Sequence, residues 1–319
     1  MTRVVALGGG HGLASTLSAL RRITPDITAI VTVADDGGSS GRLRSELGVM
    51  PPGDLRMALA ALCSDDVWGR SWADAVQYRF PGEGDVGGHS LGNLMLAALW
   101  DVTGDVVAGL DRMGALLKII GRVLPMSAEP LTIQAEVRHE GRVSTVVGQV
   151  AVATTQGRVL SVQLTPQNPP ASQAALDAIR DAEWVILGPG SWYSSVLPHL
   201  LVPAQLSALR ASPAKRVLVM NLDAGQNSGT PEGEPGEAIG LTASEHLALL
   251  SAHAPDLHFD VVIVDPQSLP HSNELAARLA TEGSQLIVAD VATGAGSLQH
   301  DPEKLAVLFS KIFSQSCTE

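Results

Sequence analysis

The chain has 319 residues and a formal net charge of −12, because 33 Asp and Glu residues outnumber 21 Lys and Arg residues. An acidic protein repels the phosphate backbones of DNA and RNA, so this charge argues against a nucleic-acid partner. No apolar run approaches the roughly 18 residues that cross a bilayer, and we therefore expect a cytoplasmic protein with no membrane span.

The chain opens with the pattern of a parallel βαβ unit. Val4–Leu7 is a short apolar run that stops at three consecutive glycines, Gly8–Gly10. Leu13–Leu20 follows with leucines at helical spacing, and Ile27–Val33 is a second run, rich in β-branched residues. Strand, glycine turn, helix and strand in this order predict the first unit of a parallel sheet.

The middle of the chain has a different pattern. Asp54–Ser64 and Leu91–Trp100 are predicted helices. Within Leu131–Gln163, apolar and polar residues alternate, and turn signals stand at Glu140-Gly141 and Gln156-Gly157. This alternation predicts an antiparallel meander with one face exposed to water.

The parallel pattern returns in the last part of the chain. Further strands are predicted at Trp184–Leu187, Arg216–Met220, Val261–Val264 and Gln285–Ala289. Further helices are predicted at Ala171–Ala182, Ala243–His253 and Asn273–Glu282, and a last helix begins at Pro302, capped by Asp301. The segment Gly225–Gly240 is rich in Gly, Pro and Glu, and we predict a mobile loop there.

These elements predict an α/β fold built on a three-layer, Rossmann-like parallel sheet. Hydrophobic residues make up 45% of the chain but aromatic residues only 3%, so aliphatic side chains must fill the core. Strands buried on both faces have this composition. We predict a nucleotide-binding core formed by residues 1–50 and 182–319, with residues 51–181 as an insertion of helices and the antiparallel meander.

The first candidate site is Gly8-Gly9-Gly10-His11-Gly12, directly after the first strand. Glycines let backbone N–H groups approach a phosphate, and the N-terminus of the following helix attracts negative charge. The motif is not the dinucleotide fingerprint, because Leu13 stands where the third glycine belongs, and no Walker-type Gly-Lys follows. Four glycines in five residues favour ligand binding over a simple tight turn. His11 either lines the ligand or fills space.

The second candidate site begins where the second strand ends, within Ala34–Arg44. A carboxylate at this place, here Asp35 or Asp36, commonly holds a ribose hydroxyl or a divalent cation. Ser39 and Ser40 supply donors, and Arg42 can pair with a phosphate. The alternative is a capped turn with a solvated charge pair, but so many donors at a strand end favour a ligand site.

Two further motifs lie in the predicted insertion. The turn Pro51-Pro52-Gly53 presents Asp54 as a helix cap and Arg56 in the first helical turn, where an arginine opposes the helix dipole. Arg56 therefore has either a functional partner or a salt bridge to a carboxylate such as Asp54. His89 and Asn93 share one helix face if their helix starts early, which suits base or amide recognition better than catalysis. Alternatively, this motif merely caps the helix through Ser90.

The fifth motif is Gly188-Pro189-Gly190-Ser191, again after a predicted strand. Like the first motif, it is a glycine-rich turn directly after a strand, and it is a candidate second contact for a phosphate or pyrophosphate. We also count Asn221, at the end of the next strand, among the candidate ligand contacts. The chain has no HExxH, GxSxG or CxxC motif, and its nine histidines show no metal spacing. Zinc-enzyme and serine-hydrolase functions therefore have no support.

In their order and spacing, these motifs resemble the CofD/YvcK family, which contains the 2-phospho-lactate transferases of coenzyme F420 synthesis and the bacterial gluconeogenesis factors. The resemblance extends from Val4 to about Ala306 and includes His300-Asp301-Pro302. The stretches Asp35–Gly41 and Pro51–Arg56 are more similar to the gluconeogenesis-factor branch. This resemblance implies a CofD-like three-layer fold, binding of UDP-sugars such as UDP-N-acetylglucosamine or UDP-glucose, and a regulatory role in cell shape and wall metabolism.

The transferase branch implies a different activity, because its members act on a guanosine diphosphate-activated phospholactate and a deazaflavin alcohol with magnesium. Asp36 matches the metal-associated acidic position of that branch. The chain departs from the branch after Asn221-Leu222-Asp223, where it continues into the longer Gly225–Gly240 loop instead of a compact stretch. Only Glu234–Glu237 resembles a remnant of that stretch.

The leading hypothesis is a non-catalytic regulator that binds a nucleotide sugar. The diphosphate would lie on Gly8–Gly12 and Gly188–Ser191, and one of the two aspartates after the second strand would hold a ribose or a cation. Arg42 or Arg56 would neutralise the phosphate. Partners that the sequence leaves open are a regulatory protein and a second copy of the chain.

The alternative hypothesis is a magnesium-dependent phosphotransferase that resembles 2-phospho-L-lactate transferase. Asp36 would hold the metal, and His89 would transfer the proton. A third hypothesis, a nicotinamide-dependent dehydrogenase, is disfavoured by the missing third glycine. No residue is singled out as catalytic with certainty by the sequence.

Overall fold

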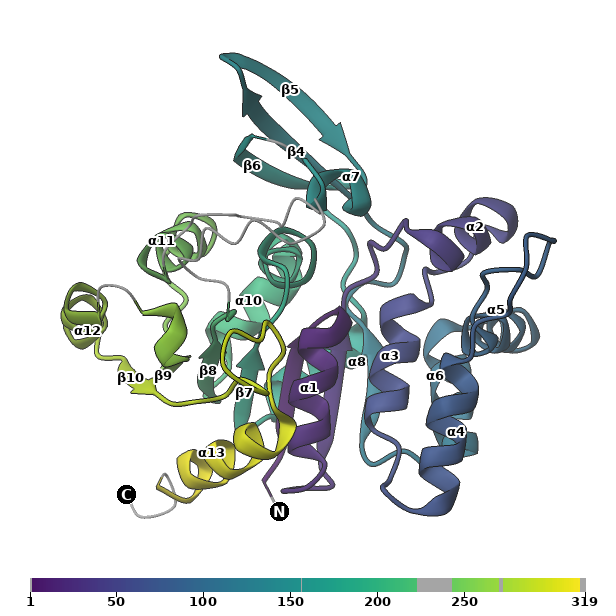
Figure 1. Cartoon of the computed structure of the whole chain (residues 1–319), viewed down its shortest axis with the longest axis horizontal. Coiled ribbons are helices and arrows are strands. Elements are labelled where there is room, and N and C mark those ends of the chain that lie inside the picture. Colours follow the sequence, from purple (N-terminus) through teal and green to yellow (C-terminus); the bar gives the residue numbers. More distant parts are fainter. Residues whose placement is uncertain (1, 156, 223–242, 270–271, 316–319) are drawn as a thin grey trace.

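The computed structural model describes residues 2–155, 157–222, 243–269 and 272–315. A seven-stranded parallel sheet, in the order β10-β9-β8-β7-β1-β2-β3, forms its centre and is flanked by helices (Figure 1). The predicted α/β fold with a Rossmann-like parallel sheet is confirmed. The strands are β1 (Val4–Gly8), β2 (Ile27–Val31), β3 (Arg122–Pro125), β7 (Trp184–Leu187), β8 (Lys215–Val219), β9 (Val261–Val264) and β10 (Gln285–Val288).

The strand order reverses at the middle of the sheet. β1 pairs on one side with β2, which pairs with β3, and on its other side with β7. From β7 the chain continues outward through β8, β9 and β10. The loops that follow β1 and β7 therefore leave the sheet in opposite directions. In an open parallel sheet, such a switch point at the carboxyl ends of the strands is where ligands bind.

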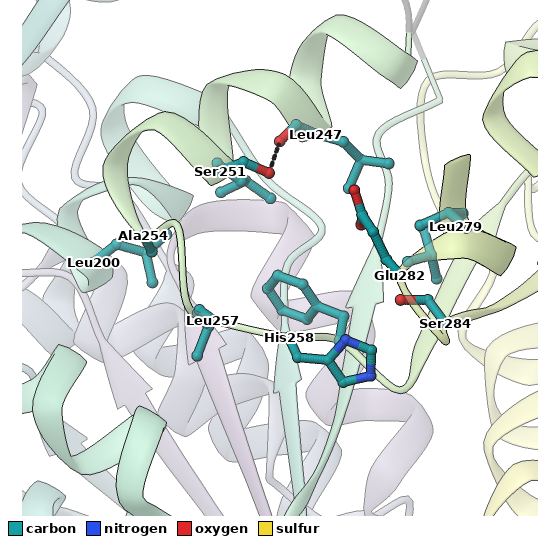
Figure 2. A pocket seen from close by; sticks show the side chains of 12 residues that line it. Leu200, Leu247, Ser251, Ala254, Leu257, His258, Leu279, Glu282 and Ser284 are labelled. Atoms are coloured by element: carbon teal, nitrogen blue, oxygen red, sulfur yellow. Dashed lines mark hydrogen bonds between the residues drawn. The ribbon is translucent and has the colours of Figure 1, made fainter. Parts of the chain in front are cut away.

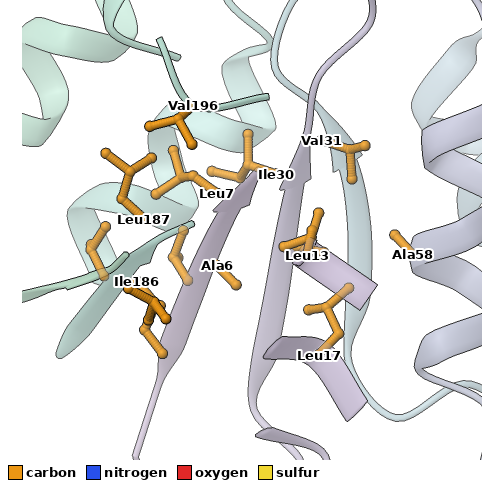
Figure 3. Packing of buried hydrophobic residues seen from close by; sticks show 14 of the residues in the cluster. Ala6, Leu7, Leu13, Leu17, Ile30, Val31, Ala58, Ile186, Leu187 and Val196 are labelled. Carbon is orange, nitrogen blue, oxygen red and sulfur yellow. The ribbon is translucent and has the colours of Figure 1, made fainter. Parts of the chain in front are cut away.

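The core of the sheet is aliphatic because its strands are buried on both faces. Leu7 and Ile30, on neighbouring strands, are fully buried, and so is Ile186 on β7. Helix α1 (Gly10–Leu20) lays Leu13 and Leu17 against the sheet (Figure 3). This packing explains the near-continuous apolar runs of the strand sequences, since a strand with one wet face would alternate.

Six helices are formed before β3, and the sequence pattern indicated only three of them. The six are α1, α2 (Gly38–Leu47), α3 (Gly53–Ala61), α4 (Val67–Gln77), α5 (Leu91–Thr103) and α6 (Val106–Leu117). Helix α2 begins with Gly-Ser-Ser-Gly, residues of low helix propensity, so its local sequence does not predict a helix. Tertiary contacts support it, because the Arg44 guanidinium donates to the Leu131 carbonyl at 2.6 Å and to the Thr132 hydroxyl at 2.8 Å.

A three-stranded antiparallel sheet stands beyond the carboxyl ends of the main strands (Figure 1). It contains β4 (Thr132–His139), β5 (Arg142–Val147) and β6 (Arg158–Thr165). The predicted antiparallel strands are confirmed, but the predicted meander order is wrong, because β4 lies in the centre and pairs with both others. The short helix α7 (Gln149–Ala153) separates β5 from β6 in the chain, so the two are not joined by a tight turn. The predicted turn at Gln156 falls on a residue outside the described part.

The segment 51–181, which we expected to be an insertion, also contributes to the main sheet. Its strand β3 extends that sheet by pairing in parallel with β2, from Thr28 opposite Arg122 to Val31 opposite Pro125. β3 is a four-residue edge strand without alternation, so its sequence gave no signal. Core and insertion are therefore interleaved at this strand.

Of the remaining helices, four match the prediction, and two short ones, α9 (Pro198–Leu201) and α10 (Pro203–Ala211), were not predicted. The four are α8 (Gln173–Asp181), α11 (Ala243–His253), α12 (Ser272–Thr281) and α13 (Pro302–Gln315), and the chain also has a π-helical turn at Trp192–Val196 and a 3-10 turn at Pro266–Ser268. Asp301 caps α13 as expected, accepting the N–H of Glu303 at 2.8 Å. The segment predicted as a mobile loop, Gly225–Gly240, lies outside the described residues. Within the described residues, no helix is long and apolar enough to cross a membrane.

An aromatic cluster fastens α13 to the sheet. The rings of Phe309 and Phe313 stack with centroids 6.0 Å apart, and Phe313 lies 4.8 Å from the ring of Trp184 on β7. Phe309 is fully buried. Since the chain has so few aromatic residues, this cluster supplies a large share of the apolar contact at this end of the fold.

Replacing Phe309 by alanine should lower the free energy of unfolding by about 3–5 kcal/mol, because it removes a fully buried ring and leaves a cavity. Val307→Ala on the same helix is the matched control. Val307 is 57% exposed, so its loss should change stability by less than about 0.5 kcal/mol. Urea unfolding measures both values, and equal losses would contradict the packing described here.

Candidate functional site

The two glycine motifs meet at the switch point. Gly12, in the first turn of α1, lies so close to the second motif that a Cβ atom there would overlap the Pro189 carbonyl. Gly10 (φ +58°) and Gly188 (φ +80°) occupy the left-handed region that favours glycine. The structure therefore brings the loops Gly8–Gly12 and Gly188–Ser191 together into one site.

Side chains of the protein brace the second loop. The Asn221 amide donates to the Gly190 carbonyl at 2.9 Å, and its oxygen accepts the Gly190 N–H at 2.9 Å. The Ser191 hydroxyl accepts the backbone N–H of Ser194 at 3.2 Å and so caps the π-helical turn. Both residues lie at the predicted place, and their polar side-chain groups shape the loop.

A buried histidine that the sequence did not single out supports the first loop. His199, fully buried on α9, bonds through Nε2 to the Gly8 carbonyl at 3.2 Å, and Gln205 bonds to its Nδ1 at 2.8 Å. Burial lowers the pKa of His199 to about 4, so the ring is neutral at physiological pH. His199 and Gln205 belong to different helices, so no motif spacing could have revealed the pair.

Asp54 reaches the first glycine loop from α3. Its carboxylate accepts the Thr32 hydroxyl at 3.0 Å and the N–H of Gly10. A Cβ atom on Gly9 would lie 2.5 Å from this carboxylate, so only glycine leaves the space between them. The predicted role of Asp54 as a helix cap is wrong, because α3 begins at Gly53 and Asp54 turns toward the loop. Burial, and then the nearby charge of Asp35, raise the pKa of Asp54 to about 6.

The two aspartates after β2 face different neighbours. Asp35 accepts the Gly37 N–H at 2.9 Å and lies against Gly53 at the start of α3, beside Asp54. Asp36 instead accepts the N–H of Val150, on α7, at 3.0 Å.

The positions of these carboxylates decide whether the site could hold a magnesium ion. Within the described residues, no three His, Cys, Asp or Glu side chains cluster so that they could hold a metal ion alone. Mg²⁺ commonly binds through one or two carboxylates and completes its shell with phosphate oxygens and water. Asp35 and Asp54, whose charges interact, fit this arrangement if a ligand supplies the phosphates.

A buried polar cluster joins the first turns of α2 and α5. Ser39 bonds through its hydroxyl to His89 Nδ1 at 2.9 Å and accepts the Asn93 amide at 2.9 Å. His89 and Asn93 meet through Ser39, but they do not share a helix face as predicted, because α5 starts only at Leu91. Burial, and then the charge of Arg42, lower the pKa of His89, so its neutral form is favoured.

Three other predicted residues lie next to this cluster. Arg42 donates to the carbonyls of Gly87 (2.7 Å) and Asp85 (2.5 Å), so its guanidinium secures the loop before α5. Ser40 accepts the Gly53 N–H at 2.9 Å. Arg56 is 7% exposed and donates to the Ser90 hydroxyl at 3.2 Å. The expected salt bridge of Arg56 to a carboxylate is not formed among the described residues.

Two hollows lie near these elements. His11 and Gly12 line a groove of about 440 Å³ that continues along α1 to Arg21, a size that suits a small-molecule ligand. A second cavity lies beneath α11 and α12, between side chains such as Leu247 and Leu279 (Figure 2). It measures about 30 Å³, which is room for about one water molecule, so this cavity is too small for a nucleotide.

Asp54→Asn should change how stability depends on pH. The unfolded pKa is near 3.8 and the folded pKa about 6, so the folded state keeps its proton to higher pH than the unfolded chain. The wild type therefore loses this stability as pH rises through about 6, whereas the asparagine variant does not. Between pH 4 and 7, the variant should gain about 1–2 kcal/mol relative to wild type, allowing for partial exposure.

Denaturant unfolding of both proteins across this pH range measures the difference. Asp35→Asn provides an independent check, since removing the neighbouring charge should shift the pH at which the wild-type loss occurs downward. Parallel stability curves for the wild type and Asp54→Asn would contradict a raised pKa.

Comparisons with known proteins agree with this architecture. The family model described as 2-phospho-L-lactate transferase CofD matches residues 4–303. A protein of Mycobacterium leprae (strain TN) is 52% identical over 310 residues, which cover 95% of this chain and 84% of the relative. The gluconeogenesis factor of Bacillus subtilis (strain 168) is 38% identical over 289 residues, which cover 91% of this chain and 86% of that protein.

A solved structure has the same fold along nearly its whole length. The crystal structure of a UPF0052 family member from Bacillus halodurans aligns with a TM-score of 0.81 and 34% identity, covering 96% of this chain and 98% of that one. A family-model match over most of the chain, and curated relatives with gluconeogenesis-factor names, lead to one conclusion. The chain belongs to the CofD family.

Proposed function

We propose that this protein is a regulator that binds a nucleotide sugar at the switch point of its sheet. The observation that carries the proposal is the contact between two glycine loops, Gly8–Gly12 and Gly188–Ser191, at the carboxyl ends of adjacent strands. Loops of this kind let backbone N–H groups approach a diphosphate from two sides. The fold positions them before any ligand arrives.

The first glycine loop offers backbone N–H donors to a ligand. Helix α1 begins at Gly10, in the middle of the loop, and has no acidic residue of its own in its first turn. The Asp54 carboxylate accepts the Gly10 N–H, so a phosphate would bind the N-terminal N–H groups that Asp54 leaves open. The exposed His11 and the adjoining groove leave room for the groups attached to the diphosphate.

The remaining parts of the ligand follow from the neighbouring residues. Asp35, at the end of β2, is suited to a ribose hydroxyl, because a carboxylate at this place commonly accepts one. We infer a UDP-sugar such as UDP-N-acetylglucosamine as the ligand class. The gluconeogenesis-factor names of the relatives support a regulatory role, and we extend it to cell shape and wall metabolism.

A second candidate function is a magnesium-dependent phosphotransferase. It is favoured by the transferase description of the matching family model and by the carboxylate pair of Asp35 and Asp54 beside the glycine loop. Asp36, the metal ligand first expected, binds a backbone N–H of α7, so the carboxylate pair fits a bound magnesium ion better. Magnesium would supply neutralisation of phosphate charge. His89 bonds to Ser39 through Nδ1, so in the tautomer in which Nδ1–H donates to Ser39 the proton would be accepted at Nε2.

Gly10→Asp should weaken binding of UDP-N-acetylglucosamine by at least about tenfold, because the new carboxylate would repel the diphosphate. Gly104→Asp is the matched control. Gly104 also has a positive φ (+67°) and open space around its Cβ position, but it lies at the far end of α5. Isothermal titration of wild type and both variants measures the affinities, and thermal unfolding confirms that each variant is folded. Equal affinities in all three proteins would refute the placement of the diphosphate.

Titrations of the wild type with GDP and NAD, with and without magnesium, separate the candidate functions. A regulator should bind the UDP-sugar more tightly than either comparator and leave it chemically unchanged. Preference for GDP together with a magnesium requirement would favour the phosphotransferase instead. Preference for NAD would contradict both proposals.

A further inference from the structure

In the part of the chain that the structure describes, Arg56 is a buried cation that forms no salt bridge. Only 7% of its surface is exposed, and its Nε–H group is buried without a hydrogen-bond partner. Its one hydrogen bond among the described residues goes to the neutral Ser90 hydroxyl. Asp54 and Asp35 act on it only at longer range, since neither lies within 4.0 Å. A buried charge of this kind is costly unless a partner neutralises it.

The surroundings of Arg56 attract a further negative charge. The first turns of α2, α3 and α5 are tied together there, because Asn93 donates to Ser39, the Gly53 N–H to Ser40, and Arg56 to Ser90. These helices have 10, 9 and 13 residues, and each directs its positive end toward the same place. Within a protein of net charge −12, such a concentration of positive potential indicates an anionic ligand.

Asn93 adds a requirement of its own. The side chain is 2% exposed, and its amide nitrogen donates to Ser39. Its Oδ1 atom is buried and has no hydrogen-bond partner among the residues that the structure describes. A buried acceptor needs a donor, which a hydroxyl group can supply. Arg56 Nη1 donates to Ser90, and Nε and Nη2 make no hydrogen bond with the described residues. The Nε–H and Nη2–H groups form one edge of the guanidinium, and such an edge can donate to both oxygens of a carboxylate.

This position adjoins the proposed diphosphate site. Asp54, two residues before Arg56 on α3, touches Gly9 of the first glycine loop. The Gly92 Cα lies against the side chain of Arg56, since a Cβ atom there would come within 2.9 Å of its Cγ. The first glycine loop and the first turns of α3 and α5 are therefore neighbours in space.

We propose that Arg56 and Asn93 form a subsite for a carboxylate and a neighbouring hydroxyl of the ligand, so that the protein prefers nucleotide sugars whose sugar is a hydroxy acid. The subsite rests on the proposed function, because the diphosphate on the glycine loops holds the sugar near it. Recognition then depends on two groups. The arginine donates to the acid, and the asparagine oxygen accepts from the adjacent hydroxyl.

UDP-glucuronic acid and UDP-glucose test this inference, since they differ only in the carboxylate of the sugar. Isothermal titration of the wild-type protein should show about tenfold tighter binding of UDP-glucuronic acid. Equal affinities, or tighter binding of UDP-glucose, would overturn the subsite even though the proposed function holds. Failure of both to bind while UDP-N-acetylglucosamine binds would overturn the subsite and leave the proposed function standing, and failure of all three would remove both. This comparison uses the native protein and needs no variant.

The Arg56→Gln variant tests whether Arg56 causes the preference for UDP-glucuronic acid over UDP-glucose. The variant should bind UDP-glucuronic acid about tenfold more weakly and keep its affinity for UDP-glucose within about twofold. Arg44→Gln is the matched control, because the Arg44 guanidinium is engaged by Leu131 and Thr132 and has a structural role. It should leave the ratio of the two affinities unchanged. A ratio that falls equally in both variants, or in neither, would show that Arg56 does not read the acid group.

Discussion

β1 and β7 pair in parallel, from Val4 opposite Trp184 to Leu7 opposite Leu187, and this pairing joins the two halves of the sheet. From β1 the chain builds outward through β2 and β3, and from β7 it builds outward through β8, β9 and β10. Because both central strands end at the same edge, the glycine loops that follow them are forced into contact. The proposed ligand site is therefore a consequence of strand order, and it would not exist in a sheet with another order.

The glycine loops are held in place by side chains that sit behind them. Asn221 spans both polar groups of the Gly190 backbone, and His199, itself supported by Gln205, binds the Gly8 carbonyl. These hydrogen bonds are neutral, and they are buried at His199 and partly buried at Asn221, so water competes little with the bonds of His199. A loop that is already ordered loses little conformational entropy when it binds a ligand, so more of the contact energy contributes to affinity.

Negative and positive side chains lie close to one another beside the first glycine loop of this acidic protein. Asp35 and Asp54 lie together on one side of the first glycine loop, and their proximity helps to raise the pKa of Asp54. Arg56 lies two residues further along α3, among three helix N-termini. A ligand with a diphosphate, hydroxyls and an acid group meets complementary partners in such a site. Both proposed functions, nucleotide-sugar binding and phosphoryl transfer, would use this arrangement of two carboxylates and one arginine.

The sequence by itself determined the elements that local periodicity encodes. The apolar runs at Val4–Leu7, Trp184–Leu187 and Val261–Val264 predicted buried strands, and these strands are formed. They could be predicted because side-chain period depends on neighbouring residues in the chain. Phosphate binding at the glycine motifs after the first two strands stays a prediction.

Only the tertiary structure decided the contacts between distant segments. It placed β3 at the edge of the main sheet, moved β6 to the far side of β4, and turned Asp54 from a helix cap toward Gly10. It also revealed the bond of His199 to Gly8 and, among the described residues, the buried Nε–H group of Arg56 that has no hydrogen-bond partner. Neither feature has a local signature in the sequence. The physical reason is that strand pairing, burial and charge separation depend on which surfaces meet in space, and a residue's neighbours in the chain do not specify this.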